Sequence, residues 1–305
     1  MYDLIIIGSG PAGLGAAIYG ARAGLEFLVL EQNAVSGGQI LTTYEVENYP
    51  GFPGIDGAEL AARFRDHGAK LGVSFMHETV LEIIELEDHK QVRTAAHVFE
   101  TKCVLLATGA TYAKLGVPGE EELKGKGVSY CATCDGAFFR DKKVAVVGGG
   151  NAALENAVYL AGLCRKVYLI HRRDRFRGEE VLQEKVKALS GKNVEILLES
   201  EVESIEGDQC VKRLKIKSRQ NETQKYMDVD GIFVAVGMKP DSELVRDLVS
   251  CDEKGYVIAG EDGVTDHPGI FVAGDVRTKK CRQIVTAVSD GANACASILD
   301  YCEKD

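Results

Sequence analysis

The feature that most limits the fold of this chain is an internal repeat. Residues 4–31 read LIIIGSGPAGLGAAIYGARAGLEFLVLE, and residues 144–171 read VAVVGGGNAALENAVYLAGLCRKVYLIH, so the two align without a gap at an offset of 140. Each copy is an apolar strand, a glycine-rich turn, an alanine-rich helix and a second apolar strand. That order predicts two βαβ units, each with parallel strands and a right-handed crossover.

A shorter echo indicates that each copy begins a complete domain. Residues 104–109 (VLLATG) resemble residues 232–237 (IFVAVG), and both are apolar runs that end at glycine. The tail after about residue 240 begins no third βαβ unit, and we expect its run at residues 270–275 (IFVAGD) to rejoin the first domain. We therefore predict an α/β fold with two Rossmann-like dinucleotide-binding domains, the second inserted into the first. The expected domains are residues 1–112 with 241–305, and residues 113–240.

Composition and charge limit the classes of protein that the chain can be. With 305 residues, 45% hydrophobic and 27% charged, it can bury two ordinary cores. A net charge of −10 disfavours nucleic acid and anionic membranes as partners, since both attract Lys and Arg. We expect no membrane span, because the apolar runs are far shorter than roughly 18 residues, and no signal peptide. The scattered cysteines suit a reducing cytosol, so the expected location is cytoplasmic.

The first glycine turn, residues 8–13 (GSGPAG), fits the G-x-G-x-x-G pattern between a strand and a helix. Gly8 allows the tight turn, Gly10 lets the backbone approach a pyrophosphate, and Gly13 lets helix and strand pack closely. The helix N-terminus attracts phosphate, and Glu31 can accept hydrogen bonds from a ribose diol. An ordinary glycine turn of an α/β protein is the alternative. The cofactor-binding residues expected here are Gly8, Ser9, Gly10, Pro11, Ala12, Gly13 and Glu31.

The second glycine turn, residues 148–153 (GGGNAA), fits G-x-G-x-x-A, but the residues that follow its second strand differ in charge from those of the first repeat. His171 stands where the first repeat has Glu31. It is followed by Arg172 and Arg173, and then by Arg177. A carboxylate would repel the 2′-phosphate of NADPH, whereas guanidinium groups bind phosphate through charge-assisted hydrogen bonds. This site should therefore prefer NADPH to NADH; the alternative is a solvated basic patch.

Cys131 and Cys134 form a C-x-x-C pair among nine cysteines. A zinc half-site would need further ligands, and the sequence holds no second C-x-x-C and no H-x-x-x-H, so we expect no bound metal. Two unlinked thiols and a redox-active disulfide are the other interpretations. The disulfide is favoured because so small a loop opens and closes readily. Asp135 lies beside Cys134 and could act as general acid or base in thiol exchange.

Two dinucleotide sites in one chain indicate a flavoprotein, and further motifs narrow the class. The motifs are GSGPAG (8–13), GGQ (37–39), EVENYPG (45–51), CATCDG (131–136), GGGNAA (148–153), HRRDRFR (171–177), AGDV (273–276) and RQ (282–283). With them the sequence resembles the bacterial-type, low-molecular-weight thioredoxin reductases over nearly its whole length. CATC in this context is the most diagnostic motif.

The resemblance implies FAD in the first domain, and NADPH with the cysteine pair in the second. It implies that Cys134 faces the flavin C4a and that Cys131 attacks a disulfide of thioredoxin or a thioredoxin-like protein. It also implies a homodimer and a rotation between the domains. Besides the first turn, the expected FAD residues are Gly38, Gln39, Asn48, Val80, Ala107, Thr108, Gly109, Gly274, Asp275, Arg282 and Gln283. The expected NADPH residues are Gly150, Asn151, Ala152, Ala153, Glu155, His171, Arg172, Arg173, Arg177, Val236 and Gly237.

We therefore expect an NADPH-dependent disulfide reductase in which hydride passes from NADPH to FAD and electrons then pass to the Cys131–Cys134 disulfide. Dithiol–disulfide exchange with the partner protein completes the reaction. Relatives that reduce ferredoxin lack the cysteine pair, and relatives that accept electrons from ferredoxin lack the arginine cluster, so both are disfavoured. A flavoprotein dithiol oxidase and a flavin redox sensor without turnover are the alternatives.

Overall fold

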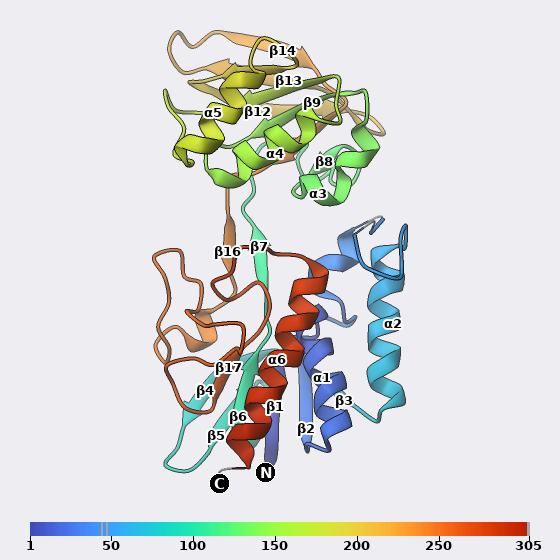
Figure 1. Ribbon diagram of the computed structural model, residues 1–305, viewed down its shortest axis with the longest axis vertical. Helices are drawn as coiled ribbons and strands as arrows, with labels where there is room; N and C mark the ends of the chain where they lie inside the picture. Colours follow the sequence, from blue (N-terminus) through green and yellow to red (C-terminus); the bar gives the residue numbers. More distant parts are fainter. Residues whose placement is uncertain (44, 47, 304–305) are drawn as a thin grey trace. The chain divides into compact units, whose positions relative to one another are not determined.

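The computed structural model describes residues 1–43, 45–46 and 48–303. Glu47 of the EVENYPG motif lies outside these residues. The chain divides into two compact units, one of Met1–Thr111 with Lys239–Asp305 and the other of Tyr112–Met238. The second unit is an insertion within the first, as the colours of Figure 1 show. None of the described helices combines the length and apolar character that a bilayer span requires.

The sheet of the first unit is built on the first repeat. Its strands are β1 (Tyr2–Ile7), β2 (Phe27–Glu31), β3 (Ser74–His77), β4 (Val80–Glu85), β5 (Lys90–Thr94), β6 (Val98–Leu106) and β17 (Ile270–Val272). They run in the order β3-β2-β1-β6-β5-β4, with β17 paired to β6. β1 is parallel to β2 and β6, and β17 is parallel to β6. The predicted βαβ unit and the return of the tail to the first sheet are both confirmed.

The two faces of this sheet bury alternate residues of β1. Leu4 and Ile6 pack in one core with the helices α1 (Pro11–Ala23) and α6 (Ile284–Cys302). Ile5 and Ile7 pack in a second core with apolar residues from the segment 244–257. Successive side chains of a strand point to opposite faces, so the uninterrupted apolar run of β1 indicates a strand buried on both faces.

Small residues let α1 and α6 lie side by side, as Figure 1 shows. A Cβ at Gly15 would lie 2.8 Å from the carbonyl oxygen of Val288, and a Cβ at Gly291 would lie 2.1 Å from that of Ala12. Larger side chains at these positions would force the helices apart. The first unit also contains α2 (Gly57–Lys70), which begins after an Asp56 N-cap, and the short 3₁₀ helices η1 (Gly38–Thr42) and η3 (Glu243–Val245).

The second unit repeats the plan of the first. Its main sheet has the order β11-β10-β9-β15-β8, and β9 is parallel to β10 and β15. An antiparallel sheet, β12-β13-β14, covers one face, where its apolar residues pack with Ala145 and Val147, whereas Val144 and Val146 pack with α4. The strands are β8 (Val128–Ser129), β9 (Lys143–Val147), β10 (Lys166–Ile170), β11 (Val194–Leu197), β12 (Ser200–Gly207), β13 (Val211–Ser218), β14 (Gln224–Asp228) and β15 (Gly231–Val234). The helices are α3 (Ala132–Asp135), η2 (Gly136–Phe139), α4 (Asn151–Ala161) and α5 (Glu180–Leu189).

Two short paired strands carry the chain into and out of the second unit. These strands, β7 (Ala110–Tyr112) and β16 (Met238–Pro240), form a small sheet of their own. Just beyond them the N–H of Ala113 donates to the carbonyl of Gly237 at 3.0 Å. The two ends of the inserted unit therefore lie next to each other.

Candidate active site

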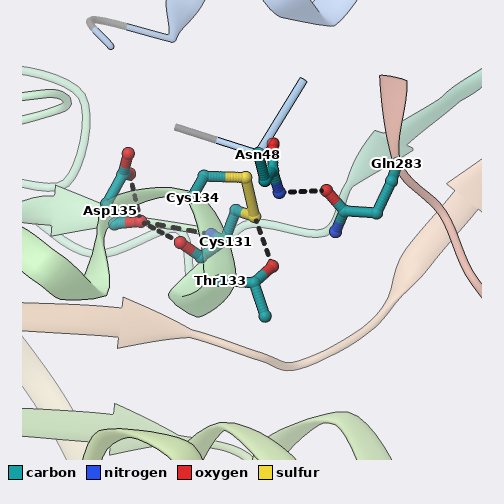
Figure 2. Close-up of a disulfide and its surroundings, with 7 residues drawn as sticks. Asn48, Cys131, Thr133, Cys134, Asp135 and Gln283 are labelled. Atoms are coloured by element: carbon teal, nitrogen blue, oxygen red, sulfur yellow. Dashed lines mark hydrogen bonds between the residues drawn. A yellow bond between two sulfur atoms is a disulfide. The ribbon is translucent and has the colours of Figure 1, made fainter. Parts of the chain in front are cut away.

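Cys131 and Cys134 are joined by a disulfide (Figure 2). Cys131 is the N-cap of the single-turn helix α3, and Cys134 lies within that turn. Their Cα atoms are 5.3 Å apart, within the ordinary range for a disulfide. The predicted bonded pair is therefore present. Across the described ranges, no group of three or more His, Cys, Asp and Glu side chains is arranged to hold a metal ion.

Asp135 is connected to the cysteine pair through Ser129. The hydroxyl of Ser129 donates to Asp135 Oδ2 at 2.6 Å, and the N–H of Cys131 donates to Ser129 Oγ at 3.1 Å. Burial raises the pKa of Asp135, and the hydrogen bond from Ser129 opposes part of that shift. A carboxyl group with a raised pKa beside a disulfide is suited to proton transfer. Ser129 was not predicted, because an isolated serine before a cysteine has no distinguishing pattern.

The first glycine turn needs glycine for two different reasons. Gly8 has φ +100°, and a Cβ there would lie 2.6 Å from the carbonyl oxygen of Ala107. A Cβ at Gly13 would lie 1.9 Å from the carbonyl oxygen of Gly8, so helix and strand pack in direct contact. Gly10 is the N-cap of α1, and a Cβ there would meet no atom within 4 Å. Packing therefore does not require a glycine at this position, and the space beside Gly10 at the N-terminus of α1 is open.

Glu31 lies at the end of β2, and its carboxylate is held by the chain itself. Oε2 accepts from the N–H and hydroxyl of Ser9 at 2.8 and 2.7 Å, and Oε1 accepts from the N–H and Nδ2 of Asn33, both at 2.9 Å. A carboxylate has about four acceptor positions, and these bonds use all of them. A ribose diol would therefore replace one of these donors. The side-chain amide of Asn33, an exposed residue, is the easiest to displace.

The loop after β17 holds buried polar atoms whose hydrogen bonds are missing. Among the described residues, Asp275 Oδ1 and Arg282 Nε are buried without a partner. Burial raises the pKa of Asp275, and the cations Lys279 and Arg282 counteract it in part. The guanidinium of Arg282 donates to the Lys279 carbonyl at 3.0 Å and lies 4.2 Å above the ring of Tyr256. Buried polar atoms are nearly always satisfied, so this pair marks a place where a polar ligand fits.

A buried ion cluster fixes the same loop to α6. Asp290 is 4% exposed, and Arg277 donates to it through Nη2 at 2.6 Å and Nε at 2.9 Å. Lys279 Nζ and the N–H of Gly274 donate to Asp290 Oδ2 at 2.8 and 3.0 Å. Sequence patterns did not identify this cluster, because Asp290 is part of no motif and lies far from its partners along the sequence. It positions Gly274 and Asp275, two of the predicted FAD residues.

The second glycine turn packs against His171. The side chain of His171 is 5% exposed, and a Cβ at Gly149 would lie 2.3 Å from its Cε1. Its Nε2 lies 3.1 Å from the Arg175 carbonyl oxygen. Burial lowers the pKa of His171, and neighbouring arginines lower it further. His171 is therefore buried beneath the turn, and its contact with a nucleotide stays a prediction. As at Gly10, a Cβ at Gly150 would meet no atom within 4 Å.

The arginines after His171 are exposed and project from a loop that is fixed to the turn. Arg172, Arg173 and Arg177 form no ion pair with any described acidic residue. The N–H of Arg177 donates to the carbonyl of Gly149 at 2.7 Å. Asn151 and Glu179 close the loop by exchanging two hydrogen bonds, at 2.7 and 2.8 Å. Asn151 therefore has a structural partner, Glu179, that sequence patterns missed.

The remaining predicted residues lie in varied settings. Asn48 Nδ2 donates to Gln283 Oε1 at 2.9 Å, and Gln283 is the N-cap of α6 (Figure 2). Val80 is buried in one of the two cores of the first unit. The side chain of Gln39 donates to the Ala110 carbonyl, and that of Thr108 to the Asp241 carbonyl. The residues Ala152, Glu155, Val236 and Gly237 are exposed on the second unit.

Comparison with known proteins identifies the class. Residues 2–291 match the family described as pyridine nucleotide-disulphide oxidoreductase. The chain is 42% identical to a thioredoxin reductase of Listeria innocua, with 100% of this chain and 95% of the relative covered. It is 41% identical to the thioredoxin reductase of Bacillus subtilis, with 100% of this chain and 96% of the relative covered.

Comparison with solved structures gives the same family. The thioredoxin reductase of Streptococcus pyogenes matches with a TM-score of 0.92 at 43% identity, covering 100% of this chain and 99% of that one. The thioredoxin reductase from Giardia duodenalis matches with a TM-score of 0.90 at 32% identity, covering 98% of both chains. The chain belongs to the pyridine nucleotide-disulphide oxidoreductases and, among these, to the low-molecular-weight thioredoxin reductase family.

Proposed function

We propose that this protein is a flavoprotein that uses NADPH to reduce a disulfide of thioredoxin or of a thioredoxin-like protein. The observation that carries the proposal is the Cys131–Cys134 disulfide with Asp135 beside it, in a chain whose two glycine turns precede opposite charges. We also propose a homodimer in the cytoplasm, on the strength of the family resemblance and the scattered single cysteines.

FAD fits the first unit. Gly10 at the N-terminus of α1 has room for a pyrophosphate, and the unpartnered Asp275 Oδ1 suits a hydroxyl donor such as the ribityl chain. Glu31 would bind the ribose by exchanging one of its present donors. Gln39, Asn48, Arg282 and Gln283 would line the flavin. Bound FAD would supply two-electron chemistry between a nicotinamide and a disulfide.

NADPH fits the second unit. Gly150 at the N-terminus of α4 has the same room for a pyrophosphate as Gly10. The exposed guanidinium groups of Arg172, Arg173 and Arg177 are free of described acidic partners, so a 2′-phosphate would meet no competitor. Two or three charge-assisted bonds to phosphate favour NADPH over NADH.

The cysteine pair divides the exchange with the partner between its two sulfurs. A single thiol cannot complete a two-electron exchange, so one sulfur attacks and the other resolves the mixed disulfide. We assign attack to Cys131 and resolution to Cys134, by resemblance to the family. Asp135 holds the proton that the leaving thiolate of the partner requires.

Turnover with NADPH and purified thioredoxin tests the function. We expect NADPH oxidation that requires the disulfide acceptor, and a Cys134→Ser variant that traps thioredoxin as a stable mixed disulfide. NADPH consumption that depends on oxygen alone would instead identify a dithiol oxidase. Binding without turnover would identify a redox sensor. If the double variant Cys131→Ser,Cys134→Ser reduces thioredoxin at the wild-type rate, the proposal is wrong.

A further inference from the structure

The hydroxyl of Ser129 lies between the Asp135 carboxylate and the backbone of Cys131. Ser129 is 5% exposed at the end of β8. Its Oγ accepts from the Cys131 N–H at 3.1 Å, and lies 2.6 Å from Asp135 Oδ2 and 3.3 Å from the Cys131 carbonyl oxygen. A hydroxyl carries one proton, so it can donate to only one of these two acceptors at a time.

We propose that Ser129 is a positioning residue that couples the charge of Asp135 to the backbone of Cys131. Its hydroxyl donates to Asp135 when that carboxylate is ionised. When Asp135 is protonated, the hydroxyl turns to the Cys131 carbonyl instead. In both states Ser129 Oγ keeps the hydrogen bond from the Cys131 N–H. The inference rests on the proposed disulfide exchange, and it assigns a role to a residue outside the CATCDG motif.

The surroundings of Asp135 make Ser129 its dominant polar contact. The helix α4 packs against α3, and its titratable residues are Glu155, which is exposed, and Tyr159, whose ring contacts Gly136. On the strand side, the Tyr130 hydroxyl donates to Glu120 and is thereby engaged elsewhere. Among the described residues, burial and the Ser129 hydrogen bond are the influences that shift the pKa of Asp135.

The coupling matters because Asp135 loses and regains a proton during the disulfide exchange. The Cys131 thiolate attacks the partner's disulfide, and protonated Asp135 gives its proton to the sulfur that leaves. The Cys134 thiol then gives its proton to Asp135 as its sulfur attacks Cys131 and expels the second partner thiolate. Asp135 ends protonated as it began, one disulfide has formed and one has broken. Ser129 stabilises the ionised carboxylate only during the interval between the two transfers.

The test measures the alkylation of Cys131 by iodoacetamide as a function of pH, in a Cys134→Ser background where Cys131 stays reduced. It needs neither thioredoxin nor NADPH, so it stays informative even if the proposed function fails. Ionisation of Asp135, one helical turn from Cys131, should appear as a low-pH limb of the rate profile. Ser129→Ala removes a hydrogen bond to the charged form, so we expect this limb to move up by about one pH unit, equivalent to about 1.4 kcal/mol.

Two matched variants make the result decisive. Ser129→Thr retains the hydroxyl and should restore the parent profile. Asp135→Asn cannot ionise, so adding Ser129→Ala to it should produce no further shift. A Ser129→Ala profile that superimposes on the parent overturns the proposal. A shift that persists in the Asp135→Asn background also overturns it, because Ser129 would then act on Cys131 without Asp135.

Discussion

The two glycine turns of this chain share a backbone plan and differ in what surrounds it. In both, a Cβ on a glycine with positive φ would clash with the carbonyl just after a neighbouring strand, at Gly8 with that of Ala107 and at Gly148 with that of Ala235. In both, the N-cap glycine of the next helix, Gly10 or Gly150, has no packing reason to be glycine. At the end of the second strand, however, the first copy has a carboxylate enclosed by neutral donors, and the second has a buried imidazole followed by exposed guanidinium groups.

The difference shows which part of such a unit is free to change. The turn itself is fixed by backbone contacts that no side chain can replace. The residue at the end of the second strand differs between the two copies, and so do its neighbours: Glu31 accepts from Ser9 and Asn33, whereas His171 packs beneath Gly149. The first turn also has a buried ion cluster around Asp290 that holds its neighbouring loop. We infer that the first site retains its cofactor, whereas the second exchanges NADPH for NADP⁺.

The largest expected effect comes from filling the N-cap positions. At Gly10 and Gly150 a Cβ would meet no atom within 4 Å, and φ of −71° and −97° suits any residue, so Gly10→Val and Gly150→Val should both fold. Gly10→Val should give a colourless protein, because the side chain occupies pyrophosphate space. Gly150→Val should stay yellow but bind NADPH about 5- to 150-fold more weakly, the range for about 1–3 kcal/mol of overpacking. Flavin absorbance and NADPH titration measure these effects. If Gly150→Val lost the flavin and Gly10→Val lost NADPH binding, FAD would belong to the second unit and NADPH to the first.

Neutralising Asp290 should affect only the first site. Asp290→Ala leaves the buried cations Arg277 and Lys279 without their anion, which typically costs about 3–5 kcal/mol. We expect a large fall in the free energy of unfolding and in FAD content, measured by urea titration and absorbance. Asp300→Asn, an exposed carboxylate on the same helix, is the control and should change stability by less than about 0.5 kcal/mol. Full FAD content in Asp290→Ala would show that the loop needs no such support.

The arginine loop should control cofactor choice. Arg172→Ala with Arg173→Ala removes two charged contacts, each worth about 1.5 kcal/mol or more, so NADPH binding should weaken by about 2–4 kcal/mol. NADH has no 2′-phosphate and should bind as before. Arg165→Ala removes an exposed charge elsewhere in the unit and should leave the preference unchanged. Equal losses for NADPH and NADH, measured by their KM values, would refute the assignment.

The smallest effect concerns the pH dependence of stability. The pKa of His171 is lowered from 6.5, so below that pH the unfolded chain binds more protons than the folded chain. His171 therefore makes the protein less stable as pH falls through 6.5 and below. His171→Gln removes this dependence. The difference in Tm by which the variant lies below the wild type should therefore become smaller as the solution is made acid. A deficit that stays constant between neutral and acid pH would mean that His171 is not neutral in the folded state.

Much of the fold could be predicted because the repeat encodes it twice. Apolar runs such as residues 4–7 and 144–147 indicate strands buried on both faces, and the glycine turns fix the strand–helix order. The return of β17 to β6 followed from one apolar run ending in Gly-Asp. The cysteine pair was equally visible, because its spacing and its place before β9 are local properties of the sequence.

What escaped prediction depends on long-range packing. Ser129 and Asp290 are ordinary residues whose importance comes from neighbours brought close by folding. The alignment of His171 with Glu31 could not show that its ring packs beneath Gly149, where the absence of a side chain leaves room for it. The sequence predicts that Glu31 can accept hydrogen bonds from a ribose diol, but it could not show that Ser9 and Asn33 donate to the same carboxylate. A sequence pattern identifies the chemical groups, and the three-dimensional packing decides which of them are available.

The pairing of β7 with β16 has a consequence for how such a chain can be altered. Because the inserted unit begins and ends on adjacent strands, it can be removed or exchanged as one cassette, with its two cut ends only a strand spacing apart. A short turn between residues 111 and 239 would close the remaining chain. The same geometry would let another unit with adjacent ends be inserted at this point, between two strands that already pair with each other.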